Sequence, residues 1–285
     1  MGKLRYICFL VFMLIWQVSI SQITHPKMSP FSSVKQEIGL VTITIDYSRP
    51  SARGRNIVGD LMPYDRIWRV GANESTKFTT SHDITIGEHL LKKGTYVLYA
   101  IPHKEYWEVI FHTNLTHWGD GRTDYKPQED AFRIQIKPEK TADFQETFLI
   151  TLNHLDHNSG IMEWIWEHTK VSIPIKVDTH EMMLGRIKTL LKDNPTAMSY
   201  YQAARYYQEQ DHDLIKALKW LDKAETLGGR TYYIHRIRSL VLEKKKDYKN
   251  AIKEAKASLK IADSLGKDEF VRMNQKNIEK LQKLL

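Results

Sequence analysis

Five arginines lie in the segment from Asp46 to Glu74, and this density points to the recognition of anions. An arginine side chain carries a fixed charge and a planar fork of donors that fits carboxylate, phosphate or sugar oxygens. A plain surface connection between two strands has no need of so many guanidinium groups. The residues that we expect to contact a ligand are Tyr47, Arg49, Arg53, Arg55, Trp68, Arg69, Asn73 and Glu74.

Proline and glycine residues hold these arginines in defined positions. Pro50 fixes its own backbone and pushes Arg49 into an extended conformation. Gly54 permits a tight turn that places Arg53 and Arg55 on either side of it. We therefore expect a pocket for a small anionic or polyhydroxylated ligand, with a tryptophan or tyrosine ring of the segment as a stacking wall.

A structural role for the arginines stays open beside this interpretation. Asp46, Asp60, Asp65 and Glu74 lie in the same segment, and arginine is the usual cation of semi-buried ion pairs. If the guanidinium groups pair with these carboxylates, they fix the connection against the rest of the domain and bind no ligand.

Catalytic chemistry has weaker support in the sequence. Glu74, His103 and Asp46 are the candidates for a general acid or base. Ser51, His103 and an aspartate could form a triad, but any chain of this size offers such combinations. The sequence has no phosphate-binding glycine loop, no nucleophile elbow and no HExxH motif.

Four histidines lie as pairs in two expected loops, His112 with His117 and His154 with His157. Neither pair has an evident third ligand, and convincing zinc sites need three or four converging ligands. We therefore assign no metal site and no cofactor, and we favour a protein without catalytic activity.

Residues 1–21 have the features of a secretory signal peptide. Lys3 and Arg5 precede an almost wholly apolar run over residues 6–20, and small residues follow it. The run is about 15 residues long, against roughly 20 for a membrane span, so an uncleaved anchor is the alternative. The single cysteine, Cys8, lies inside the run. We expect an exported chain, periplasmic or secreted, with no disulfide and no transmembrane span after cleavage.

Residues 22–177 have the pattern of an all-β domain. Short alternating or apolar runs are separated by turn residues such as Gly87 and Gly94. About nine or ten such strands favour a β-sandwich or a partly closed barrel. The clearest expected strands are 41–46, 83–86, 89–91, 95–101, 107–111, 133–137, 147–154, 161–166 and 169–175.

Residues 178–285 change to a helical pattern, which makes the chain an α+β multidomain protein. Ala217 and Leu221 correspond to Ala251 and Ala255 at an offset of 34, the tetratricopeptide period. The signature of the first helix is poor, so we expect one and a half to two degenerate repeats and a closing helix. This part holds 22 Lys and Arg against 15 Asp and Glu, a net charge of +7. Such a surface either docks an acidic partner or is a solvated helical face.

An ordered series of short motifs runs from about residue 27 to residue 177. Its pieces are Ser29-Pro30, Ile45-Asp46-Tyr47-Ser48-Arg49-Pro50-Ser51, Arg53-Gly54-Arg55, Trp68-Arg69-Val70-Gly71-Ala72-Asn73-Glu74, Gly94-Thr95-Tyr96, Ile101-Pro102, Trp107 and Trp118-Gly119. This series resembles an uncharacterised bacterial family, the domain of unknown function 2911. The resemblance implies a β-rich domain and export, in proteins largely of the Bacteroidetes group, and a helical repeat tail is a familiar addition. It implies no activity and no catalytic residues.

Taken together, these patterns favour an exported binding or interaction protein. The β domain would bind a small anionic or carbohydrate ligand, or a peptide segment, near the arginine-rich connection. The helical tail would dock a protein partner, and we expect no binding of nucleic acid. The alternatives are an envelope hydrolase acting on glycan or ester substrates, and a purely structural scaffold.

Overall fold

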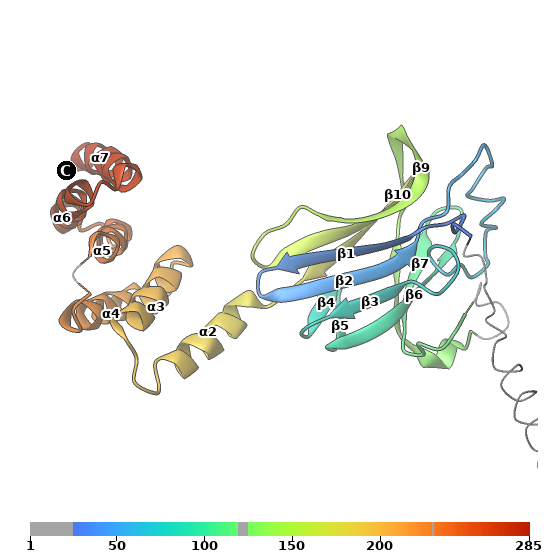
Figure 1. The fold of residues 1–285 in the computed structure, drawn as a ribbon, viewed down its shortest axis with the longest axis horizontal. Coiled ribbons are helices and arrows are strands. Elements are labelled where there is room, and N and C mark those ends of the chain that lie inside the picture. The colour runs from blue at the N-terminus through green and yellow to red at the C-terminus, as the bar shows by residue number, and fades with distance from the viewer. Residues whose placement is uncertain (1–24, 119–124, 230) are drawn as a thin grey trace, which may run out of the picture. The chain divides into compact units, whose positions relative to one another are not determined.

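The computed structural model describes residues 25–118, 125–229 and 231–285. It divides into two compact units, one ending at Thr179 and the other running from His180 to Leu285. The first unit is built of strands and the second of helices (Figure 1). The expected signal peptide, residues 1–21, lies outside the described residues.

The strands described in the first unit form two antiparallel sheets. One sheet has six strands in the order β1-β2-β3-β6-β7-β8, and the other has four in the order β5-β4-β10-β9. The two sheets do not close into a barrel, so the sandwich is the correct one of the two expected architectures. The strands are β1 (Phe31–Ile38), β2 (Val41–Ser48), β3 (Lys77–Thr80), β4 (Ile84–Ile86), β5 (His89–Leu91), β6 (Gly94–Pro102), β7 (Trp107–His112), β8 (Asp130–Ile136), β9 (Glu139–Asn153) and β10 (Ser159–Lys176).

The alternation of side chains explains how these strands pack. In β2, Val41, Ile43 and Ile45 are fully buried while the residues between them are half-buried, as expected for a strand with one face on the core. In β6, every side chain from Val97 to Ala100 is buried. β6 lies inside its sheet, between β3 and β7, and consecutive buried side chains show that both of its faces are covered.

Contacts between β2 and β9 join the two sheets. The rings of Tyr47 on β2 and Phe148 on β9 meet edge to face, with centroids 5.9 Å apart. The backbone N–H of Ile150 on β9 donates a hydrogen bond to the Tyr47 hydroxyl at 3.0 Å. Tyr47 therefore serves as a fixed link in the core of the sandwich.

One long strand, β10, replaces two strands expected from the sequence. β10 spans both expected strands, 161–166 and 169–175, as one strand of 18 residues. Its pairing with β9 shifts register on both sides of Glu167, and Glu167 has a φ of +49°. This irregularity is typical of a β-bulge, which interrupts the alternation without ending the strand.

The second unit consists of helices that pack as neighbours in sequence: α3 on α4, α5 on α6, and α6 on α7. Ala217 and Ala251, which are 34 residues apart, are fully buried, so two helices can approach closely at each position. Among the described residues, no helix combines the length and apolar character needed to cross a membrane. The helices are α2 (Thr179–Leu190), α3 (Ala197–Glu209), α4 (Leu214–Thr226), α5 (Tyr232–Lys244), α6 (Tyr248–Ser264) and α7 (Asp268–Gln282), and a short 3-10 helix, η1 (Pro127–Glu129), precedes β8.

Candidate ligand-binding site

The arginine-rich segment is the long connection from β2 to β3, which lies at one end of the sandwich (Figure 1). Backbone hydrogen bonds tie it to both sheets. The N–H of Ala52 donates to the carbonyl of Glu146 at 2.8 Å, and Trp68 and Ala100 exchange N–H···O=C bonds of 2.7 and 2.8 Å. These hydrogen bonds fix the backbone of the connection, so its side chains project in defined directions.

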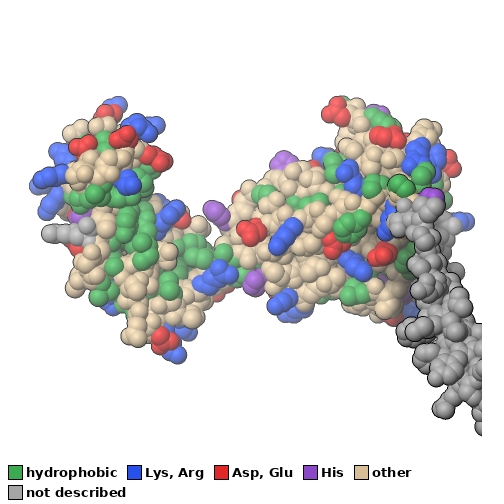
Figure 2. Space-filling view, viewed as in Figure 1, with side chains coloured by type: hydrophobic (Ala, Val, Ile, Leu, Met, Phe, Trp, Pro, Cys, Tyr) green, Lys and Arg blue, Asp and Glu red, His purple; other side chains and the backbone are tan. Residues whose placement is uncertain are grey.

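Four of the five arginines line one pocket of about 410 Å³. They are Arg53, Arg55, Arg66 and Arg69, and no aspartate or glutamate is among the described residues that line it. Figure 2 shows Lys and Arg side chains gathered at the end of the β unit that carries this connection. The described wall of the pocket therefore carries cationic side chains and no carboxylate.

Aromatic rings form one wall of this pocket. Trp68 and Trp166 both line it, and their rings stack with centroids 6.0 Å apart. Trp68 also makes edge-to-face contacts with the rings of Phe148 and Trp107, whose centroids lie 5.2 and 6.1 Å from its own. Because four rings fix one another, the wall is rigid and presents a flat apolar surface beside the guanidinium groups.

Backbone carbonyls position several of the guanidinium groups without neutralising them. Arg55 donates to the carbonyls of Ala52 and Ser51, at 2.9 and 2.8 Å. Arg53 donates to the carbonyl of Met28 at 3.2 Å. In the part of the chain that the structure describes, the guanidinium of Arg66 has no hydrogen-bond or ion-pair partner.

Four of the five arginines do not form the local ion pairs that the sequence left open. Within the described residues, Arg49, Arg53, Arg55 and Arg66 have no ion pair with Asp46, Asp60, Asp65 or Glu74. Asp65 instead contacts Nδ1 of His103 at 2.5 Å. These carboxylates therefore do not neutralise these four arginines.

Three residues expected at the site hold the structure beside the pocket. Arg49 donates from Nε to the carbonyl of Phe148 at 2.8 Å and is not part of the lining. Asn73 donates to the carbonyl of Ser29 at 3.0 Å and to the hydroxyl of Ser48 at 3.2 Å. Tyr47 is the link between the sheets described above. Tyr47 and Asn73 line a second, smaller pocket of about 170 Å³.

The structure brings two of the three candidate catalytic residues to one pocket. Asp46 and Glu74 line the smaller pocket, whose described lining contains no histidine. His103 lines neither pocket, and its nearest carboxylates are those of Asp65, at 2.5 Å, and Glu108, at 3.9 Å. Among the described residues, His103 therefore does not share a pocket with Asp46 or Glu74.

One group of side chains was not anticipated from the sequence. His112, His117 and Glu129 offer ligand atoms that lie within 4.8 Å of one another. The sequence singled out the two histidines but not the glutamate, because Glu129 follows His117 by 12 residues with no metal-binding spacing. The pairing of β7 with β8 brings Glu129, which directly precedes β8, close to His112.

Comparison with known protein families matches residues 29–175 to the family described as "Protein of unknown function (DUF2911)". The matched range is slightly more than half of the chain, and it contains the whole of the arginine-rich connection. Neither the curated proteins nor the solved structures gave a match.

Proposed function

Because the chain belongs to the DUF2911 family, whose function is unknown, we propose a function from the site itself: the β unit binds a small organic anion in the arginine-lined pocket. The observation that carries this proposal is the composition of the wall, whose described residues include four arginines and no carboxylate. Clefts lined by one sign of charge concentrate ligands of the opposite sign.

Arg66 is the strongest candidate for direct recognition of the anion. It lines the pocket, and its guanidinium makes no contact with any polar partner in the described part of the chain. Arg55, by contrast, is oriented by two carbonyls. One free and one oriented guanidinium suit a carboxylate or phosphate group, which arginine binds through two parallel hydrogen bonds.

The size and walls of the pocket indicate the rest of the ligand. A volume of about 410 Å³ lies at the lower end of the range of small-molecule pockets, roughly 300–1,000 Å³. The stacked rings of Trp68 and Trp166 offer a flat surface on which a sugar or an aromatic ring can lie. The favoured class is therefore a ring that carries an anionic group, such as a uronic acid, a phosphorylated sugar or an aromatic carboxylate.

Thermal melting of the full chain tests this proposal. The panel contains glucuronate, glucose 6-phosphate and benzoate, with neutral glucose as the matched control. A ligand that binds only the folded state adds about 2.7 kcal/mol to the free energy of unfolding at 100 times its Kd. We expect at least one anion to raise the melting temperature of the β unit, and glucose to leave it unchanged.

Arg66→Gln and a control variant make the test specific. Arg66→Gln removes the charge of an exposed side chain, so we expect normal folding and loss of most of the ligand-induced shift. Arg272→Gln removes an exposed charge from α7 and should leave the shift intact. No shift with any anion, or an equal shift in Arg66→Gln, would count against the arginine pocket.

We also propose that the chain is exported and that its helical unit docks a protein partner. The apolar run at residues 6–20 supports export, and the charge of +7 on residues 178–285 supports an acidic partner. Mass spectrometry of the mature protein tests export, because cleavage would leave Gln22 at the N-terminus. Affinity capture with and without residues 180–285 tests docking, and an unchanged set of captured proteins would remove that role.

A further inference from the structure

We propose that His112, His117 and Glu129 bind one divalent transition-metal ion, with zinc as the best match. None of the three residues lines the arginine pocket, so this site is independent of the proposed ligand-binding function. Imidazole nitrogen and carboxylate oxygen are the donors that zinc takes alongside cysteine. The two sites can therefore be tested separately in the same protein.

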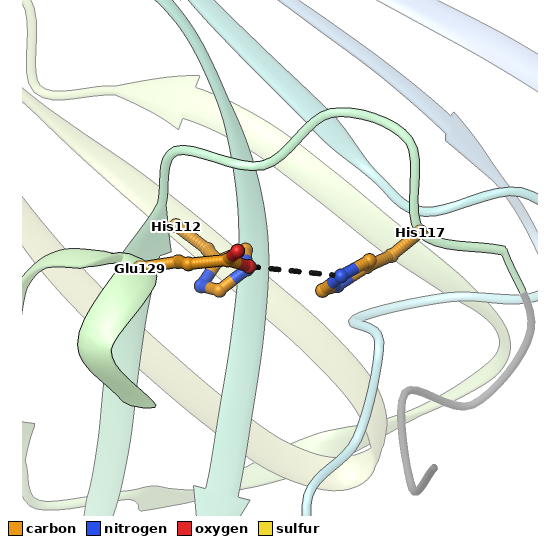
Figure 3. A group of neighbouring side chains, drawn as sticks. All are labelled: His112, His117 and Glu129. Atoms are coloured by element: carbon orange, nitrogen blue, oxygen red, sulfur yellow. Dashed lines mark ion pairs between the residues drawn. The ribbon is translucent and has the colours of Figure 1, made fainter. Parts of the chain in front are cut away.

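The spacing of the three ligand atoms suits one ion. Oε2 of Glu129 lies 3.4 Å from Nε2 of His112 and 3.7 Å from Nε2 of His117. Donor atoms placed about 2.0–2.1 Å from a tetrahedral zinc ion are roughly 3.3 Å apart. In Figure 3 the carboxylate of Glu129 lies against the ring of His112, and the ring of His117 points toward it from the opposite loop. Small side-chain movements would bring all three atoms onto a common ion.

A buried carboxylate orients His112 for this task. His112 is fully buried, and its Nδ1 lies 2.9 Å from Oδ1 of Asp130. If Nδ1 carries the proton, Nε2 presents its lone pair to the ion, which is the carboxylate–histidine–metal arrangement common in zinc proteins. Nε2 of His112 is buried and has no hydrogen-bond partner among the described residues, so the ligand atom is available.

Other donors hold Asp130 as the anion that this arrangement needs. The Tyr125 hydroxyl donates to Oδ2 of Asp130 at 2.6 Å, and Nε of Arg133 donates to the same oxygen at 2.7 Å. The two bonds fix the orientation of the carboxylate from two sides.

The remaining two ligands are also positioned by neighbours. Nδ1 of His117 lies 3.4 Å from the hydroxyl of Tyr99, which leaves its Nε2 facing Glu129. The side-chain amide of Asn114 donates to Oε2 of Glu129 at 3.0 Å. Metal-binding residues are normally supported by such outer partners, and each of these three ligands has one.

A plain contact between histidine and glutamate explains the cluster less well. It would leave Nε2 of His112 in the protein interior with no hydrogen bond, and an unsatisfied buried polar group costs about 1–3 kcal/mol. A bound ion satisfies this atom. Three protein ligands also leave one position of a tetrahedral zinc ion for water, as in catalytic rather than structural sites.

Metal titration of the full chain, without a histidine tag and after treatment with a chelator, tests the proposal. We expect calorimetry with Zn²⁺ to give one ion per chain, and Co²⁺ to give the visible absorption of a tetrahedral nitrogen–oxygen site. Glu129→Gln should lower the Zn²⁺ affinity by at least about tenfold. Asp130→Asn, which changes the partner of a ligand, should lower it by about 10- to 100-fold.

His168→Gln is the matched control, because His168 is exposed and lies outside the cluster. Its Zn²⁺ affinity should equal that of the wild type. Thermal melting in the chelator checks that each variant folds. Glu129→Gln should fold normally, because the side chain of Glu129 is 30% exposed. Absence of stoichiometric Zn²⁺ binding, or unchanged affinity in Glu129→Gln, would overturn the site while leaving the anion pocket untouched.

Discussion

At the scale of single residues, the arginine pocket depends on a backbone that few residue types could adopt. Val70 is fully buried and has a φ of +52°, a conformation that is rare for a β-branched residue. Gly71 follows with a φ of +141°. Strained positions of this kind cost about 1–3 kcal/mol each and persist where the surrounding structure fixes them. They place Arg69 and Trp68 against the wall of the pocket.

Gly71→Ala tests this dependence. A Cβ at position 71 would lie 2.9 Å from the carbonyl oxygen of Ser48 and 3.1 Å from the hydroxyl of Thr76. Because Ser48 contributes backbone, the clash cannot be relieved by a rotamer change. We expect a loss of about 1–3 kcal/mol in the free energy of unfolding of the β unit, measured by urea denaturation with tryptophan fluorescence.

Gly54→Ala is the control for backbone conformation without a clash. Gly54 has a φ of +71°, and a Cβ there would meet nothing within 4 Å. The variant should lose less than about 1 kcal/mol in the free energy of unfolding. Alanine lowers the entropy of the unfolded chain, and this gain partly offsets the cost of placing a Cβ in the left-handed conformation. Equal losses in the two variants would contradict a steric role for Gly71.

At the scale of elements, periodicity predicted most of the strands. It missed one edge strand and one short strand, and it divided one long strand into two. β2 and β6 follow from alternation and burial. β1 was missed because it has exposed or half-buried residues at all positions before Ile38, as an edge strand can. β3 was missed because four residues give too little pattern. The joining of two expected strands into β10 depends on the bulge at Glu167, which local sequence does not reveal.

The two candidate sites also differ in how far local sequence predicts them. The sequence pointed to the connection that carries the arginine pocket because the four arginines lie within 17 consecutive residues, from Arg53 to Arg69. It did not single out Arg66, and it included Arg49, which does not line the pocket. The histidine cluster was not predictable, because Glu129 reaches His112 through the pairing of β7 with β8. Local spacing carries information about turns and connections, whereas it carries none about which strand becomes the neighbour of another.

The turn between β9 and β10 gives a prediction of pH dependence. The carboxylate of Asp156 accepts backbone N–H bonds from Asn158 and Ser159, at 2.6 and 2.7 Å, and a bond from the Ser159 hydroxyl at 2.8 Å. The bond from Asn158 is the largest cause that lowers the pKa of Asp156 below 3.8. A carboxyl group whose pKa is lowered by folding stabilises the folded state above its unfolded pKa, and this contribution disappears as the pH falls through the folded pKa.

Asp156→Asn should therefore be less stable than the wild type at pH 7. The difference should shrink as the pH falls below 3.8, the ordinary value for this group. Urea denaturation at pH 7 and at pH 3 measures it. Asp143→Asn is the control, since the carboxylate of Asp143 has no hydrogen-bond donor in the described chain. A difference that stays constant with pH would show that the turn does not depend on the charge.

At the scale of the whole molecule, the β unit and the helical unit each have their own core. The first helices share one cluster that includes Tyr207, Trp220 and Val241, and the last ones share another around Ala251 and Leu281. No residue of the arginine pocket or of the histidine cluster belongs to the helical unit. We therefore expect damage to the helical core to leave both candidate sites intact.

Asn274→Ala tests this independence in the full chain. Asn274 is fully buried, donates to the hydroxyl of Ser258 at 2.8 Å and accepts from Arg236 at 3.0 Å. Its loss removes the hydrogen bond of the Arg236 guanidinium and leaves the Ser258 hydroxyl with its bond to the carbonyl of Tyr232 alone, and a lost buried partner costs about 1–3 kcal/mol. We expect the helical circular-dichroism signal to melt at a lower temperature. The Zn²⁺ affinity and the anion-induced shifts in melting temperature should stay unchanged.

Asn250→Ala serves as the matched control, because Asn250 is exposed on the first turn of α6 and bonds only to Asp247. It should change the melting of the helical unit by little. If Asn274→Ala also weakens binding of Zn²⁺ or of the anion, the two units are energetically coupled. Binding at the sites in the β unit then depends on the helical unit as well.

The pairing of β10 with β4 has a consequence for how the chain folds. β4 and β5 are hairpin strands of three residues each, too short to be stable alone. The other partner of β4 is the far end of β10, where Ile175 faces Ile86. On the ribosome, the four-stranded sheet therefore cannot form until some 90 further residues have been made, and contacts so distant in sequence make folding slow. This sheet is thus completed only near the end of the synthesis of the β unit.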